Sequence, residues 1–268
     1  MPYNTMLILC RNKLRISLTK QLFYAIIHLM RDINSMKEGI AVKYILNGTP
    51  IPYDLSINQL RQMMESPTMK DFALACEVLS WHKSHEAYEI MKEYINDKDK
   101  YRRLYILQTI FRHPEAVELT DFLEKAISSD DLLFVNNGLL TVANYKIKVS
   151  DSLLFSVITK HLSKLSYGAL TALKGRGMSE ENYRNLTRLF QKAEQCSQKE
   201  AIGEILFAKY LPAKAMELFD LFRRDTFAKI RLLALKIGNK YHYDISPFLS
   251  DTDGHVKKLA KAFLEDRL

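Results

Sequence analysis

The chain has 268 residues, of which 47% are hydrophobic and 26% are charged, and its formal net charge is +8. These values are typical of a folded soluble protein, and nine glycines and seven prolines supply too few turns to favour an all-β fold. Cys10, Cys76 and Cys196 are odd in number and far apart, which excludes a disulfide framework and favours a reducing, cytoplasmic location.

The positive charge is unevenly distributed along the chain. Residues 1–134 contain 17 Lys and Arg and 17 Asp and Glu, whereas residues 135–268 contain the remaining 22 and 14. The whole excess therefore lies in the second half. Such an excess bears on partners and solubility rather than on the fold.

The N-terminal part is predicted to contain one helix, Leu18–Asn34. Its most apolar run, Leu22–Met30, is shorter than the ~20 residues that a membrane span needs, and no small-residue cleavage site of a signal peptide follows it. An Asn-Gly turn and two prolines in Asn47–Pro52 cannot continue a helix. We therefore expect residues 1–53 to form a helical N-terminal cap and linker, and residues 54–268 to form a separate domain.

Helical periodicity dominates the remainder of the chain. Ser66 is predicted to cap a helix in which Pro67 takes the first position. Ser84 and Ser179 are predicted to cap two further helices, and the glutamates after Ser179 suit the positive end of the helix dipole.

From about residue 86 onwards the predicted helices form pairs that recur at intervals of 30 to 33 residues. The first helix of each pair is expected to begin near Glu86, Glu118, Asp151, Glu181, Pro212 and Tyr243. The second helix of each pair is expected to begin near Lys98, Asp130, Ser163, Ser197, Asp225 and Asp253. A single pair cannot bury its own apolar side, so successive pairs are expected to stack into a continuous core.

The last two pairs share a specific pattern. Superposing "DTFAKIRLLALKI" on "DTDGHVKKLAKAF" matches an acidic turn, an apolar residue, a base and a small residue in both segments. The positions expected to be buried are Ile230, Ala234, Val256, Ala260 and Phe263. This pattern resembles the second helix of HEAT-type repeats, although those usually run to ~40 residues or more. The tetratricopeptide and ankyrin signatures are absent.

The resemblance implies an all-α fold, a right-handed, armadillo-like superhelix of about six helical hairpins. In HEAT-type proteins the base of each second helix tends to pair with a turn acid of its own or a neighbouring repeat. Arg102, Arg231 and Lys257 are therefore expected to form a structural ladder with Asp97 or Asp99, Asp225 and Asp251. In "DDLLFVNNGLLTV" Asn136 replaces the base.

Three lysines on the predicted helix of Arg231 lie away from the position of that base. At about 100° per residue, Lys229, Lys236 and Lys240 fall on the edge of their helix opposite Arg231. They form either an ordinary solvated face or a basic edge that docks an acidic partner.

Aromatic and histidine clusters are alternative candidate sites. Trp81 shares a helix face with Leu74 and Val78, and Tyr101 occupies a repeat core position, so both are expected to be buried. Cys76 and Cys196 are expected to act as small buried hydrophobes. His82, His85, Glu86 and Glu89 lie close together along the chain, but Ser84 is predicted to separate them between two helices, so no metal site is expected.

No catalytic motif is recognisable, and the loop Gly175–Ser179 is interpreted as a helix connection rather than a phosphate-binding loop. The first functional expectation is a non-enzymatic scaffold, without cofactor, that binds another protein along its second helices. The alternative is a nucleic-acid-binding protein. The resemblance extends that alternative to a divergent DNA glycosylase for alkylated bases, although the tryptophans of such enzymes are missing here.

Overall fold

The computed structural model describes residues 45–46, 49–50, 54–210 and 212–266. By its contacts the chain divides into Met1–Pro50 and Ile51–Leu268. In the first part, β1 (Ile45–Leu46) and β2 (Thr49–Pro50) pair in antiparallel fashion, with Ile45 opposite Pro50. The helix predicted over Leu18–Asn34, and Cys10, lie outside the described residues.

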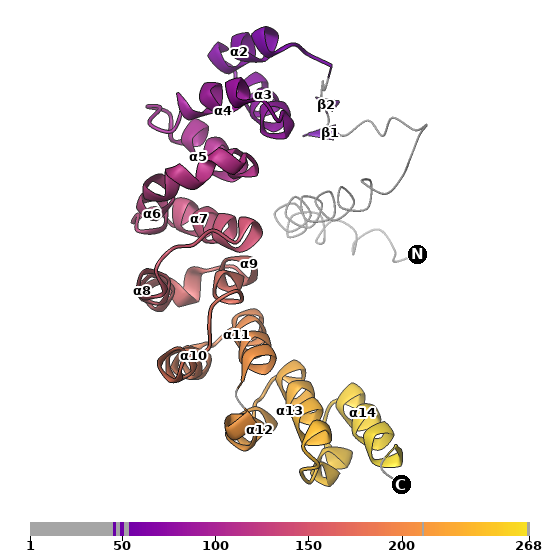
Figure 1. The fold of residues 1–268 in the computed structure, drawn as a ribbon. Coiled ribbons are helices and arrows are strands. Elements are labelled where there is room, and N and C mark those ends of the chain that lie inside the picture. Colours follow the sequence, from indigo (N-terminus) through magenta and orange to yellow (C-terminus); the bar gives the residue numbers. More distant parts are fainter. Residues whose placement is uncertain (1–44, 47–48, 51–53, 211, 267–268) are drawn as a thin grey trace, which may run out of the picture. The chain divides into compact units, whose positions relative to one another are not determined.

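The second part is helical, which confirms the all-α fold class (Figure 1). Its α-helices are α2 (Ile57–Glu65), α3 (Met69–Trp81), α4 (His85–Lys92), α5 (Lys100–Thr109), α6 (Thr120–Ile127), α7 (Leu132–Tyr145), α8 (Asp151–His161), α9 (Tyr167–Leu170), α10 (Glu180–Lys192), α11 (Cys196–Lys209), α12 (Ala215–Arg223), α13 (Ala228–Lys240) and α14 (Gly254–Glu265). Short 3₁₀ helices connect some of them: η1 (Ile110–Arg112), η2 (Pro114–Leu119), η3 (Leu162–Lys164), η4 (Thr171–Leu173), η5 (Pro212–Lys214) and η6 (Ser246–Ser250).

Hydroxyl and carboxylate side chains set many of the helix starts. Ser84 and Ser179 cap α4 and α10 as predicted, because each side chain accepts a hydrogen bond from a backbone N–H of the first turn. The prediction for Ser66 was wrong, since this residue ends α2, and Thr68 caps α3 instead. Asp99, Asp131 and Asp253 cap α5, α7 and α14 in the same way.

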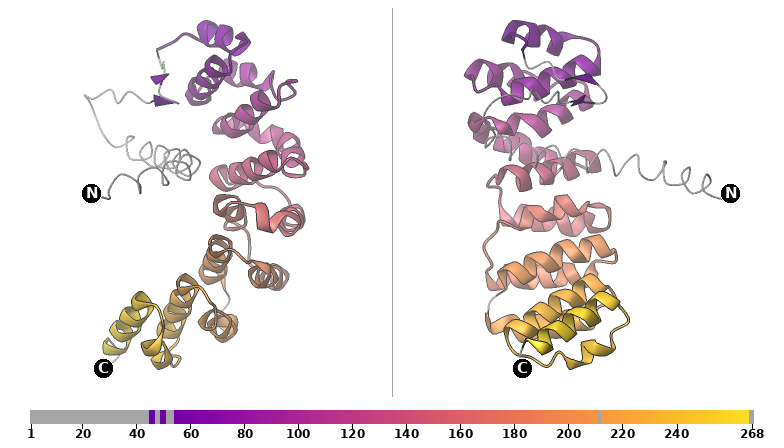
Figure 2. Two further views of the ribbon diagram at one scale, coloured as in Figure 1. Left: turned by 180° about the vertical axis from the view of Figure 1, so that it is seen from behind. Right: turned by 90° about the vertical axis from the view of Figure 1, so that its right-hand side faces the viewer.

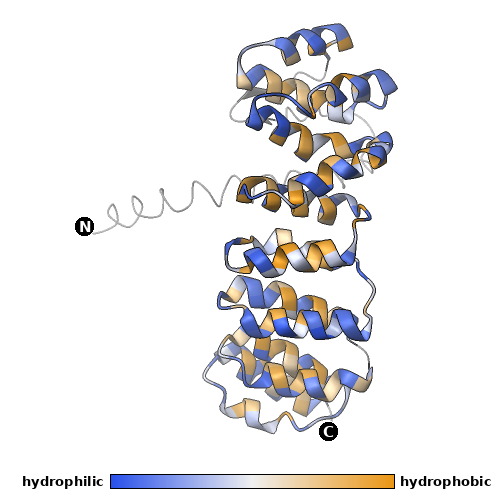
Figure 3. Ribbon diagram, turned by 90° about the vertical axis from the view of Figure 1, so that its left-hand side faces the viewer, coloured by the Kyte–Doolittle hydropathy of each residue, from blue (hydrophilic) through white to orange (hydrophobic). Residues whose placement is uncertain are grey.

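The helices lie in two rows (Figures 1 and 2). We call α3, α5, α7, α9, α11, α13 and α14 the second helices, and each of them packs against the next in this order. The elements α4, α6, α8, α10 and α12 lie on the other side, and most helices carry a hydrophobic and a hydrophilic band (Figure 3). The expected starts are close to the observed ones, except that η6 stands where a helix was predicted near Tyr243.

The core follows the predicted register in the last two second helices. Ile230, Ala234, Val256 and Ala260 are completely buried, whereas Phe263 is half-buried. Cys76 is buried and Cys196 is partly exposed, so the expectation for the cysteines is confirmed for Cys76 alone. None of the helices in the described part of the chain combines the length and the apolar character that a membrane span requires.

Candidate partner-binding surface

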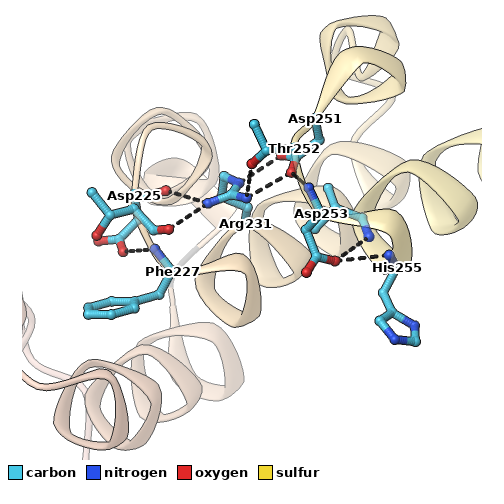
Figure 4. Close-up of polar contacts among 9 residues, drawn as sticks. Asp225, Phe227, Arg231, Asp251, Thr252, Asp253 and His255 are labelled. Atoms are coloured by element: carbon cyan, nitrogen blue, oxygen red, sulfur yellow. Dashed lines mark hydrogen bonds and ion pairs between the residues drawn. The ribbon is translucent and has the colours of Figure 1, made fainter.

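Arg231 joins α13 to the turn that precedes α14 (Figure 4). Its Nε and Nη2 donate to the two carboxylate oxygens of Asp251, each at 2.7 Å. Its Nη1 donates to the backbone carbonyls of Asp225 at 2.9 Å and Thr226 at 2.8 Å. The paired side chains are only 13% and 7% exposed, so the contact is largely shielded from water.

The charge of Asp251 depends on this contact. Hydrogen bonds from Arg231 hold the pKa of Asp251 below its ordinary value, and the backbone N–H of Asp253 and the charge of Lys257 act in the same direction. Lys257 itself is exposed and forms no ion pair with any described residue. The structure thus brings Arg231 and Asp251 together and leaves Lys257 at the surface.

Asp225 has a different partner from the one expected. Its carboxylate accepts hydrogen bonds from Lys199 Nζ at 2.6 Å and from the backbone N–H of Phe227 at 2.9 Å, while Arg231 contacts only its backbone carbonyl. Lys199 belongs to α11 and lies over the ring of Phe190. The angular pattern of one helix cannot reveal a partner from the preceding helix, and for this reason Lys199 was missed.

In α5 the predicted pair of Arg102 and Asp97 is present as an ion pair at 3.8 Å, and the neighbouring Arg103 makes a further contact to the same turn. Arg103 donates to the carbonyls of Asp97 and Lys98, the same offsets along the chain that Arg231 uses. Arg102 also lies 4.8 Å from the ring of Phe72 and donates to the Ser66 carbonyl at 2.5 Å. The sequence pattern pointed to Arg102 alone, so the contacts of Arg103 were not predicted.

Other second helices also bond to the turn that follows them. Lys100 Nζ is 3.3 Å from Asp131, the cap of α7. Asn136, which replaces the base in α7, accepts a hydrogen bond at 2.9 Å from the backbone N–H of Ser166, the cap of α9. These contacts stabilise neighbouring pairs against each other and are structural rather than functional.

Large apolar side chains are exposed on three neighbouring second helices. Tyr101, Leu133 and Tyr167 are 52%, 40% and 36% exposed, and each is the first or second residue of α5, α7 or α9. We call these three residues the apolar edge. The helices α5, α7 and α9 pack against one another in this order, so the three side chains occupy equivalent places along the row. Tyr101 was predicted to be buried, and this prediction was wrong.

Trp81 was also wrongly predicted to be buried, since it is 44% exposed at the end of α3. Its ring lies 4.6 Å from the guanidinium of Arg112, and its Nε1 donates to Glu77 at 2.9 Å. Arg112 and Glu77 form a nearly buried ion pair at 2.8 Å beneath it. Trp81 thus covers a buried charge pair and leaves part of its ring accessible.

The three lysines of the predicted basic edge have different surroundings. Lys229 forms an ion pair with Glu200 of α11 at 2.6 Å, and this contact raises its pKa. Lys236 Nζ lies 6.0 Å from the ring centre of Phe207. Lys240 Nζ lies 5.6 Å from the ring centre of Tyr210 and 5.4 Å from that of Tyr241. We call Phe207, Tyr210, Lys236, Lys240 and Tyr241 the lysine–aromatic patch.

The histidine cluster is only loosely assembled. His85 lies 3.7 Å from Glu89 and 3.9 Å from Glu115, whereas His82 turns to Ser84. Within residues 54–210 and 212–266 no three potential metal ligands come close enough to hold an ion. The loop Gly175–Ser179 connects η4 to α10, and Arg176 anchors it by donating to the backbone carbonyl of Val149 at 2.8 Å.

No protein-family model matches the sequence, and no curated protein matches it significantly.

Proposed function

We propose that residues 54–268 are a cytoplasmic, non-enzymatic scaffold that binds another protein along its second helices. We further propose that their architecture is a right-handed superhelix of HEAT-like hairpins. The succession of second helices that each pack on the next supports this architecture, and so do the repeated contacts between one helix and the following turn. In such stacks each pair interacts mainly with its neighbours and leaves a long surface for partners.

The apolar edge is the observation that carries the proposal. Seven large hydrophobic side chains are exposed among the described residues, and three of them form the apolar edge at the starts of the neighbouring second helices α5, α7 and α9. Tyrosine and tryptophan contribute strongly to protein interfaces because they bury a large area and keep a polar group for hydrogen bonding. A row of such side chains on neighbouring helices is therefore a suitable docking surface for a protein segment.

A peptide-display selection against the full chain tests this proposal. We expect the selected peptides to lose at least about tenfold in affinity for the Tyr101→Ser/Leu133→Ser variant. The matched control is Val117→Ser/Met216→Ser, which removes two exposed apolar side chains from η2 and α12. Peptides that bind both variants as tightly as the wild type, or a selection that yields no specific peptide, would contradict the proposal.

Nucleic-acid binding is the second candidate, and α10 provides its specific support. Arg184, Arg188 and Lys192 are exposed at four-residue spacing on this helix, and none forms an ion pair with a described carboxylate. If the protein is a scaffold, its affinity for duplex DNA should not exceed that of an ordinary basic surface, ~10⁻⁴–10⁻⁶ M at physiological salt. Much tighter binding that falls when these three residues are neutralised would favour the second candidate.

A further inference from the structure

Lys236 and Lys240 differ from Lys229 in what balances their charge. Lys229 is neutralised by Glu200, and Glu204, one turn later in α11, accepts a hydrogen bond from the hydroxyl of Tyr167 at 2.5 Å. No carboxylate among the described residues forms an ion pair with Lys236 or Lys240, and both side chains are exposed. Their ammonium groups are therefore the part of the predicted basic edge that remains available to a ligand.

The aromatic rings restrict where these ammonium groups lie. Phe207 and Tyr210, at and just after the end of α11, have ring centres 6.2 Å apart, and Tyr210 meets Tyr241 edge-on at 6.0 Å. The apolar part of a lysine side chain packs well on such a surface, and the ring faces attract the ammonium. A charge held in place in this way loses less conformational entropy on binding than a freely moving surface lysine.

We propose that the lysine–aromatic patch binds an acidic segment of a protein partner, whose aspartate or glutamate carboxylates accept hydrogen bonds from Lys236 and Lys240. The inference rests on the proposed scaffold function and specifies the chemistry of the partner. Charge complementarity determines the sign of the ligand's charge. Two oriented ammonium groups that have no carboxylate partner among the described residues favour an anionic ligand.

Two observations favour separate carboxylates over a nucleic-acid strand. Glu204 lies on the neighbouring helix α11, three residues before Phe207, and has no cation partner among the described residues, so it would repel a continuous line of phosphates. A lysine ammonium already lies over each of the Phe207, Tyr210 and Tyr241 rings, which leaves less ring surface for stacking on bases than single-strand-binding proteins use.

The spacing of the two lysines defines the acidic segment further. Lys236 and Lys240 are one helical turn apart, which corresponds to about 6 Å along α13. Alternate residues of an extended chain are separated by about 6.6 Å. A segment with an acidic residue at every second position therefore places successive carboxylates opposite the two ammonium groups.

Fluorescence anisotropy with synthetic peptides tests the inference. The probe is a labelled peptide of alternating Glu and Ser, compared at physiological salt with its Gln–Ser counterpart and with oligo(dT). We expect the full chain to bind the Glu–Ser peptide at least about tenfold more tightly than the other two probes. We expect Lys236→Gln/Lys240→Gln to lose at least about tenfold in that affinity and Lys236→Arg/Lys240→Arg to retain it.

The control variants separate local recognition from net charge. Arg184→Gln/Lys192→Gln removes the same two charges from α10, and Lys229→Gln removes the lysine that is already paired. Both should bind the Glu–Ser peptide within about threefold of the wild type. Equal losses in the two double variants, or tighter binding of oligo(dT) than of the peptide, would overturn the inference. Failure of the apolar-edge experiment alone would instead refute the proposed docking surface on α5 and α7.

Discussion

At the scale of single residues, Arg231 links two helical pairs through both ends of its guanidinium group. It donates to both oxygens of Asp251 and to two backbone carbonyls of its own helix start. The pKa of Asp251 is lowered by these hydrogen bonds, so its folded-state value lies below the value in the unfolded chain. The contact therefore stabilises the folded state above about pH 3.9, and this stabilisation is lost as the pH falls through the lower, folded-state pKa.

The Asp251→Asn variant tests the strength of this contact. At pH 7 we expect its free energy of unfolding to fall by about 1–3 kcal/mol, because Arg231 keeps a shielded charge without its carboxylate. The difference from the wild type should shrink as the pH falls below about 4 and through the lower, folded-state pKa of Asp251, because the carboxylate is protonated in both states only below that pKa. Urea unfolding at several pH values measures both effects. Asp130→Asn is the control, since Asp130 is 95% exposed and its pairing with Lys160 contributes little. An equal loss in the two variants would rule out this role of Asp251.

Sequence reasoning located Arg231 correctly in its helix because the acidic turn, the base and the small residue recur in α13 and α14. The same pattern predicted the pair of Arg102 and Asp97, which is present at 3.8 Å, but the predictions that Trp81 and Tyr101 are buried were wrong. Both errors have one cause: periodicity gives the face of a residue but not where its helix begins or ends. Trp81 lies on the same face of α3 as Val78. Because it is the last residue of that helix, its ring extends over Arg112 instead of entering the core.

At the scale of helices, the packing of α12 on α13 depends on a glycine. A Cβ atom at Gly238 of α13 would lie 2.5 Å from Ile245 and 2.8 Å from the ring of Phe219, and both of these side chains are buried. Alanine normally favours a helix over glycine by about 1 kcal/mol. Here the overlap outweighs that preference, because neither neighbour has free space into which it can move.

We therefore expect Gly238→Ala to lower the free energy of unfolding by about 1–2 kcal/mol, within the usual range for overpacked cores. Gly254→Ala is the matched control, because Gly254 opens α14 and a Cβ there meets no atom within 4 Å. That variant should keep its stability or gain up to about 1 kcal/mol. Denaturant unfolding of both variants decides the matter, and equal stability of the two would contradict the close approach at Gly238.

The sequence predicted the pairing and the starts of the helices better than it predicted whether a segment forms an α-helix or a short 3₁₀ helix. Acidic or hydroxyl caps marked the starts of α4, α8, α10 and α14 within one residue. The segment near Tyr243 forms only the five-residue η6, which has Pro247 in its first turn. The apolar edge and the lysine–aromatic patch could not be predicted, because each combines residues from different helices, and their exposure depends on which neighbours cover them.

At the scale of the whole molecule, each second helix from α3 to α13 contacts the next one in the row. A defect in one pair should then weaken that pair and its neighbours more than distant ones, because coupling passes only through shared interfaces. Globular domains with a single core instead lose stability everywhere at once. This difference provides a test of the proposed superhelix that needs no partner.

Val256→Asp places a charge in the completely buried interior between α13 and α14. We expect a loss of several kcal/mol locally, because no lysine or arginine is fully buried in the part of the chain that the structure describes, so the carboxylate has no buried cation to pair with. Hydrogen exchange read by mass spectrometry should show faster exchange in α12, α13 and α14 and unchanged protection in α3 and α4. Ala262→Asp adds the same charge at an exposed position of the same helix and should leave both regions unchanged. Uniform loss of protection from α3 to α14 in Val256→Asp would mean that these helices form one cooperative core, and the proposed repeat architecture would then be wrong.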